Sequence, residues 1–257
     1  MREAIQIVWK ISVLTELALA IRLFAAGLAG TYPALQTASI AFAVKSAILI
    51  ALYAHAYPRP QMREVSTDLG ILEALVVAWI VYEIFSSWTK RYRGIGAFGK
   101  TIFLFVLLSS FGLSLLTWGA EIDNSSYAGV FRYYYVGHRV VLTVCALFLI
   151  GMRLFFRTYP ALVPPNVQRY TNVALFYFGT NALAELIFTL TRTTYVTGVN
   201  LAIVSATTVS FAAWALLLDR VGGTEPVREG ISTGRFLKTE QLNDELLGVM
   251  DRLRGSR

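Results

Sequence analysis

Residues 128–157, AGVFRYYYVGHRVVLTVCALFLIGMRLFFR, decide the fold class of this chain. The middle of the stretch, from Val140 to Met152, contains no charge and no proline. Thirty residues of α-helix measure about 45 Å, which is enough to cross the hydrocarbon core of a bilayer and both of its interfaces. The tyrosines at 133–135 and the arginines Arg153 and Arg157 are typical of the two ends of a membrane-spanning helix. We therefore interpret this stretch as a transmembrane helix.

The composition agrees with an integral membrane protein. Of the 257 residues, 56% are hydrophobic and only 15% are charged, whereas soluble domains are about a quarter charged. The net charge of +7 does not indicate nucleic-acid binding, because most basic residues fall in segments that we predict to be cytoplasmic. The single cysteine, Cys145, excludes an intramolecular disulfide. We expect the protein in the cytoplasmic (plasma) membrane, with its first helix retained as the targeting element.

Seven apolar segments separated by short connections predict an all-α integral membrane fold, a seven-transmembrane-helix bundle. The predicted spans are 4–28, 36–57, 67–88, 99–120, 128–156, 169–190 and 197–219. Lysine and arginine concentrate in the third-to-fourth and fifth-to-sixth connections and in the C-terminal tail. Because basic loops remain in the cytoplasm, we expect the N-terminus outside and the C-terminus inside. The second-to-third connection, with Arg59 and Arg63, departs from this pattern.

The composition changes after the last span and divides the chain into a membrane domain, residues 1–219, and a cytoplasmic tail, residues 220–257. Residues 222–226, GGTEP, are typical of a linker, and residues 239–254 predict a short amphipathic helix. Its apolar residues on one face are Leu242, Leu246, Val249, Met250 and Leu253. We expect this helix to lie on the inner membrane surface or to dock under the bundle, with a protein partner as the less favoured alternative.

Ionisable and amide side chains lie inside several predicted spans, where charge is costly and often functional. In the predicted orientation they fall near the midplane or in the outer half of the membrane. We predict that they line a polar, outward-facing cavity that binds a small ligand, and structural pairing between helices is the alternative. The predicted cavity residues are Lys10, Glu16, Lys45, Glu73, His138, Arg139, Tyr177, Asn181, Glu185 and Asn200.

Residues 94–101, GIGAFGKT, match the phosphate-loop pattern GxxxxGK[ST] and, in part, the dinucleotide pattern GxGxxG. Both patterns need a preceding β-strand and a soluble α/β sheet, whereas here a membrane span stands on each side. We therefore expect no nucleotide. The nearby basic side chains instead predict contact with the phosphates of anionic lipid headgroups at the cytoplasmic face. These residues are Lys90, Arg91, Arg93 and Lys100.

The sequence contains no recognisable catalytic or metal-binding set. Its two histidines, His55 and His138, lack the cysteine or carboxylate spacing of a metal site and fall at different predicted depths, which disfavours joint haem ligation. No nucleophile and base can be paired at a credible spacing. We therefore expect no metal, no cofactor and no catalytic residue.

A short similarity links residues 22–35 to residues 153–162, because each contains Arg-Leu-Phe followed by Thr-Tyr-Pro-Ala-Leu. Both copies follow helices of the same predicted orientation, as a 3+1+3 parallel duplication of helices would require. The alternative is that both are ordinary arginine-rich helix ends at the membrane interface.

These observations leave three functional hypotheses. The first is a non-enzymatic, receptor-like sensor that binds a small ligand and relays a signal across the bilayer. The second is a small-solute transporter built on the 3+1+3 repeat. The third is an integral membrane enzyme or haem protein, which has the least support in the residues.

Overall fold

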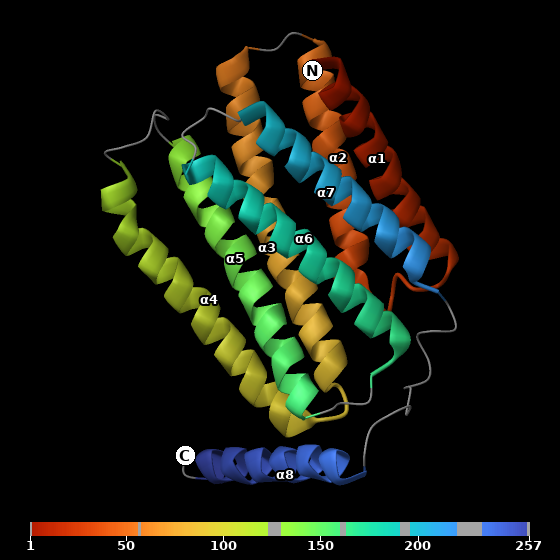
Figure 1. Ribbon diagram of the computed structural model, residues 1–257, viewed down its shortest axis with the longest axis vertical. Coiled ribbons are helices and arrows are strands. Elements are labelled where there is room, and N and C mark those ends of the chain that lie inside the picture. The colour runs from red at the N-terminus through yellow and green to blue at the C-terminus, as the bar shows by residue number, and fades with distance from the viewer. Residues whose placement is uncertain are drawn as a thin grey trace.

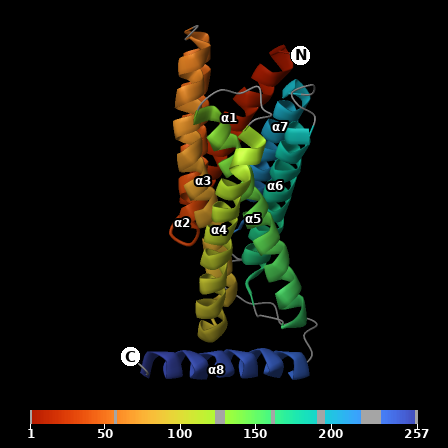
Figure 2. The same cartoon turned by 90° about the vertical axis from the view of Figure 1, so that its left-hand side faces the viewer.

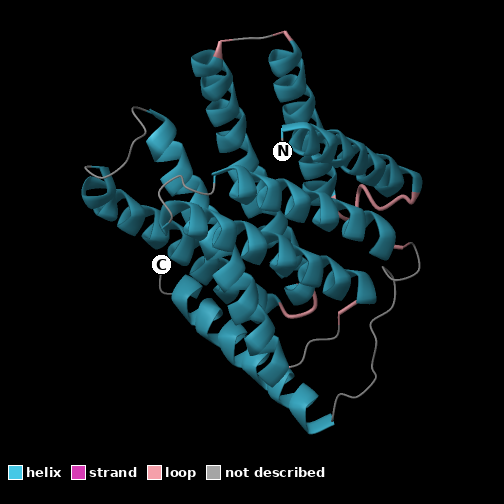
Figure 3. Cartoon of the chain, turned by 45° about the horizontal axis from the view of Figure 1, so that its top comes forward, coloured by secondary structure: helices cyan, strands magenta, loops and turns pink. Residues whose placement is uncertain are grey.

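The computed structural model describes residues 2–55, 58–122, 130–159, 163–190, 196–219 and 233–255. In these residues all regular secondary structure is helical, which confirms the predicted all-α class (Figures 1 and 3). The helices are α1 (Arg2–Ala25), α2 (Pro33–Ala54), α3 (Arg59–Thr89), α4 (Arg93–Ile122), α5 (Val130–Thr158), α6 (Pro165–Leu190), α7 (Val196–Leu217) and α8 (Thr233–Gly255).

The first seven helices run alternately up and down the long axis of the molecule (Figure 1). Six of them form a closed ring, in which α1 packs against α2, α2 against α3, α3 against α5, α5 against α6, α6 against α7, and α7 against α1. α4 lies outside this ring and packs against α5, against α8 and, to a lesser extent, against α3. α8 lies crosswise at one end of the bundle, and the N-terminus lies at the opposite end (Figures 1 and 2).

Four helical segments among the described residues are long and apolar enough to cross a membrane: Pro33–Ala54, Glu64–Thr89, Gly137–Thr158 and Gly198–Leu217. The outer surface of the bundle is correspondingly apolar. Phe24, Phe105 and Leu216 are 78%, 70% and 74% exposed, as expected for side chains that face lipid rather than water. The chain is therefore a multi-pass helical membrane protein.

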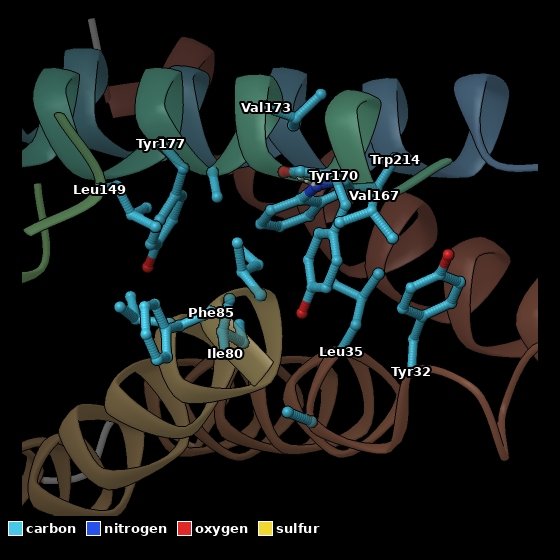
Figure 4. Close-up of a cluster of buried hydrophobic side chains, with 14 of the residues drawn as sticks. Tyr32, Leu35, Ile80, Phe85, Leu149, Val167, Tyr170, Val173, Tyr177 and Trp214 are labelled. Carbon is cyan, nitrogen blue, oxygen red and sulfur yellow. Dashed lines mark hydrogen bonds between the residues drawn. The ribbon is translucent and has the colours of Figure 1, made fainter. Parts of the chain in front are cut away.

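Aromatic side chains fill the interior between α2, α3, α6 and α7. The ring of Tyr170 lies 5.3 Å from that of Tyr32 and 5.8 Å from that of Trp214. Nε1 of Trp214 donates to the backbone carbonyl of Tyr170 at 3.3 Å. Figure 4 shows Tyr170 and Tyr177 pointing from α6 into the space in front of α2 and α3. Such packing and hydrogen bonding hold helices together in lipid, where no hydrophobic effect operates between them.

Several helices begin earlier than the sequence analysis predicted, and prolines explain the difference. The spans predicted to start at residues 36, 67 and 169 begin at Pro33, Arg59 and Pro165. Proline fits the first turn of a helix, because the backbone N–H that it lacks would have no partner there. The predicted boundaries are therefore too late, because these prolines lie in the first turn of the helices and not before them.

A glycine also ends the first helix. Gly27 has φ of +70°, the left-handed conformation that only glycine adopts at no steric cost. The N–H of Leu28 donates to the carbonyl of Leu23 at 2.8 Å, and that of Gly27 to the carbonyl of Phe24 at 3.0 Å. This pair of bonds is a Schellman motif, which satisfies the last carbonyls of α1 before the chain turns into α2.

The glycines of the phosphate-loop-like segment are packing residues in a tight pair of helices. α4 begins at Arg93 rather than at residue 99, so this segment is helical and no phosphate-binding loop is present in it. A Cβ at Gly96 would lie 3.1 Å from Oγ1 of Thr89, and one at Gly99 would collide with the ring of Phe85. The pattern therefore reflects the close approach of α3 and α4.

Gly94 serves the contact between α4 and the C-terminal helix. α8 extends over residues 233–255, beyond the predicted 239–254, and the predicted linker at 222–226 lies outside the described residues. The N–H of Gly94 donates to Oδ1 of Asn243 at 2.9 Å, and Leu242 and Leu246 pack against the core. The structure therefore has α8 docked under the bundle, which is one of the placements that we expected from the sequence.

We predict that Gly94→Ala displaces α8. The added Cβ would collide with the backbone carbonyl of Asn243, and overpacking of this kind costs about 1–3 kcal/mol. Maleimide labelling of a cysteine introduced at Leu242, which is half-buried against the bundle, should become faster. Gly248→Ala on α8 is the matched control, because no atom lies within 4 Å of the position of its Cβ. Equal labelling rates in the two variants would contradict the role of Gly94 in holding α8 against the bundle.

Candidate functional site

Four ionisable side chains from four helices meet inside the bundle, and we call them the charge network: Lys45 of α2, Glu73 of α3, His138 of α5 and Glu185 of α6. Lys45 forms an ion pair with Glu73. Nδ1 of His138 lies 2.7 Å from Oε1 of Glu185, and its Nε2 lies 3.9 Å from Oε1 of Glu73. The imidazole of His138 therefore stands between two carboxylates that come from opposite neighbours in the helix ring.

Helical spacing explains why three of these side chains point inward. Buried residues follow or precede each of them at intervals of 4, 7 and 11 positions, which is one face of an α-helix. On α3 these residues are Val77, Ile80 and Ile84; on α5 they are Leu142, Cys145 and Leu149; and on α6 they are Asn181, Phe178 and Ala174. Glu73, His138 and Glu185 thus continue the three apolar faces that build the core.

The charge network is shielded from the surroundings. The side chain of Lys45 is 22% exposed, and those of Glu73, His138 and Glu185 are 10–11% exposed. Removing one partner of such a buried pair leaves an uncompensated charge and costs about 3–5 kcal/mol. The network therefore ties α2, α3, α5 and α6 together through contacts that have no substitute in lipid.

Glu16 of α1 extends this polar layer to a fifth helix. It is 1% exposed, and its Oε1 accepts a hydrogen bond from Oγ of Ser12 at 2.8 Å. Its Oε2 has no hydrogen-bond partner within the part of the chain that the structure describes. Lys45 and Glu73 are close enough to interact with it electrostatically.

The remaining predicted cavity residues divide into two groups. Tyr177 and Asn181 are buried on α6, and Nδ2 of Asn181 donates to the carbonyl of Tyr177 at 2.7 Å. Arg139 is partly buried beside His138. Lys10 and Asn200, by contrast, are exposed on α1 and α7, so the structure does not bring them to the charge network. The sequence analysis considered only how deep Lys10 and Asn200 lie in their predicted spans, and it did not consider which face of the helix carries them.

A further buried carboxylate, that of Glu83, is absent from the predicted site and stabilises the start of α2. Oε2 of Glu83 accepts from the backbone N–H of Ala34 at 2.7 Å, and its Oε1 accepts from the hydroxyl of Tyr170 at 2.8 Å. α2 has no side-chain cap of its own, and a carboxylate there also suits the positive end of the helix dipole. Burial, with Glu83 nearby, raises the pKa of Tyr32 to about 12.

Two arginines stabilise the C-terminal end of α7. Nη1 of Arg169 donates to the carbonyl of Leu217 at 2.9 Å and pairs with Oδ2 of Asp219 at 2.7 Å. Nη2 of Arg22 donates to the carbonyl of Leu218 at 3.2 Å. Cations suit the negative end of a helix dipole, so these residues have a structural role.

The basic residues predicted to contact lipid phosphates lie at the end of the bundle that carries α8. Lys90, Arg91, Arg93 and Lys100 are all exposed, and Nζ of Lys100 lies 5.0 Å from the centre of the Tyr82 ring. A lysine over a tyrosine is typical of a membrane interface, where both side chains reach the headgroup level. Contact with anionic lipid remains a prediction.

The side chains present suit electrostatic and proton chemistry rather than metal binding. Among the described residues, no three His, Cys, Asp or Glu side chains are grouped as metal ligands. His55 is exposed just after the end of α2, whereas His138 is enclosed by the charge network. Comparison of the chain with protein-family models, with curated proteins and with solved structures found no match.

We predict that Lys45→Met lowers the free energy of unfolding by about 3 kcal/mol, because it leaves Glu73 buried without its cation. Adding Glu73→Gln should restore part of the loss, so the two changes are not additive. Unfolding in mixed micelles, followed by circular dichroism, measures the cycle. Lys10→Met is the control, since this lysine is exposed. Additive effects of Lys45→Met and Glu73→Gln would show that the pair is not coupled.

Proposed function

We propose that α1 to α7 all cross the membrane, with the N-terminus outside and α8 in the cytoplasm. The opposite positions of the N-terminus and α8 along the bundle support this orientation (Figure 2). Basic residues at the α8 end of α3, α4 and α5 support it too, because cytoplasmic ends of membrane helices are rich in lysine and arginine. These residues are Lys90, Arg91, Arg93, Arg153 and Arg157.

Reporter fusions test this orientation. A periplasm-active reporter joined before Arg2 and a cytoplasm-active reporter joined after Gly255 should both be active, because seven crossings place the two ends on opposite sides. The same fusions made after residue 92 supply an internal reference for the cytoplasmic side. Activity of both terminal reporters in one compartment would contradict the proposal.

Within this orientation, the protein acts as a membrane sensor whose input site is the charge network. The observation that carries this proposal is that His138, held between Glu73 and Glu185, joins three helices of the ring through charges rather than through apolar packing. A small ligand that competes for one of these charges would change the balance that holds the helices together. Ionisable groups enclosed in a membrane protein are commonly the place where such input is received.

The output side of the proposal is α8. α5, which carries His138, packs against α4, and α4 packs against α8. The contact between Gly94 and Asn243 joins backbone to side chain at close range, so a shift of α4 moves α8 with it. A packed element with two arrangements is what relays binding between distant sites.

A small-solute transporter is the second candidate, and the helix ring favours it. α1, α2 and α3 follow one another around the ring as α5, α6 and α7 do, with α4 outside, as in a 3+1+3 repeat. The second copy of the repeated sequence is only partly visible, because residues 160–162 lie outside the described part of the chain. Uptake of radiolabelled sugars, amino acids and organic acids into proteoliposomes distinguishes transport from sensing.

We predict that Glu185→Gln changes the exposure of α8. The substitution removes the carboxylate that holds His138 and so perturbs the network at its input. Labelling of a cysteine at Leu242 should change about fivefold or more, the lower range of typical allosteric coupling. Ser205→Ala on α7 is the control, since it removes the hydroxyl of a half-buried residue outside the charge network. Labelling unchanged from wild type in Glu185→Gln would rule out the proposed relay.

A further inference from the structure

We propose that the ligand of the charge network is a proton, bound by His138 between Glu73 and Glu185. This inference rests on the sensor function proposed above and names the chemical class of its ligand. It is carried by the hydrogen-bonding geometry of the imidazole, by the charge balance of the network and by its position along the helices.

The geometry around His138 is complementary to the protonated ring. Nδ1 lies 2.7 Å from Oε1 of Glu185, and Nε2 faces Oε1 of Glu73 at 3.9 Å. Imidazolium carries an N–H on both nitrogens and can interact favourably with a carboxylate on each side. Neutral imidazole has one N–H and one lone pair, so one of the two carboxylates would face a lone pair.

The charge balance points the same way. Among the described residues, the charged groups that interact electrostatically with His138 are Glu185 of α6, Glu73 of α3 and Lys45 of α2. Arg139 follows His138 in α5, and Glu16 of α1 lies within electrostatic reach of Lys45 and Glu73. Within the four residues of the charge network, protonation of the ring gives two positive and two negative charges, which cancel. With the ring neutral, the same four side chains, which are 10–22% exposed, carry a net charge of −1. A buried net charge is costly, so loss of the proton favours a different arrangement of the helices.

The network suits a proton better than a metal cation. Nδ1 of His138 is already hydrogen-bonded to Glu185, and the ammonium group of Lys45 repels a further cation. A proton needs no coordination space of its own and uses the carboxylates in their present positions. Glu16, 1% exposed and in electrostatic reach of Lys45 and Glu73, is a further proton acceptor in the same layer.

The position of His138 determines which side supplies the proton. His138 lies eight residues after the first residue of α5, and Glu185 five residues before the last residue of α6. Both helix ends belong to the end of the bundle opposite α8 (Figure 1). In the proposed orientation the network is therefore nearer to the outer surface, and the protein responds to external pH.

The test observes His138 directly. The chain has two histidines, and His55 is exposed beyond the end of α2, so His55→Gln leaves a single imidazole without disturbing the network. The ¹⁵N NMR signal of labelled histidine in nanodiscs should convert reversibly between imidazolium and imidazole from about pH 5 to about pH 9. Glu185→Gln in the same background should lower the midpoint by about one pH unit or more, because the imidazolium loses its hydrogen-bonded carboxylate.

Labelling of a cysteine at Leu242, measured across the same pH range, separates this inference from the sensor proposal. A common midpoint for His138 and for α8 exposure supports both. A His138 signal that does not change with pH, or a midpoint unmoved by Glu185→Gln, overturns proton binding and leaves the sensor proposal to its own test. Titration of His138 with no response of α8 supports the proton site and overturns the relay. Ser205→Ala, which leaves the network intact, should reproduce the titration of the His55→Gln protein.

Discussion

A charge inside a bilayer has no water to solvate it, so it must find its counter-charge on another part of the same protein. In this molecule that constraint joins Lys45, Glu73, His138 and Glu185 across neighbouring helices of the ring. Apolar packing alone would let the helices slide, because lipid tails compete equally well for their surfaces. The charge network instead specifies which helices are neighbours and at which depth they meet.

The sequence predicted the membrane class and the polar layer, because both depend on short-range patterns. Long uncharged stretches reveal membrane helices, and the four-residue spacing of Tyr177, Asn181 and Glu185 puts these buried residues on one face of α6. The same reasoning also included Lys10 and Asn200, which are exposed in the structure. A span boundary fixes the depth of a side chain in the membrane, whereas its direction around the helix axis depends on which neighbours the helix acquires.

Features that arise from contact between distant segments escaped the sequence analysis. Glu83 caps α2 from another helix, and a cap supplied from about fifty residues away leaves no local sequence signal. The glycines at 94, 96 and 99 matched a nucleotide-binding pattern because both uses of glycine require backbone to approach another group closely. Proline at the first turn of α2, α3 and α6 was similarly ambiguous, since the same residue can end a helix or begin one.

The crosswise position of α8 affects how a movement of the bundle reaches the ends of this helix. α8 contains 23 residues and is therefore about 35 Å long, and Asn243, which meets Gly94, lies near its middle. The helix therefore contacts α4 near its centre, and about 17 Å of helix extends on either side of this contact. If α8 tilts by a few degrees about this central contact, its two ends move by more than an ångström in opposite directions. Small internal rearrangements would then be magnified at the two ends of α8.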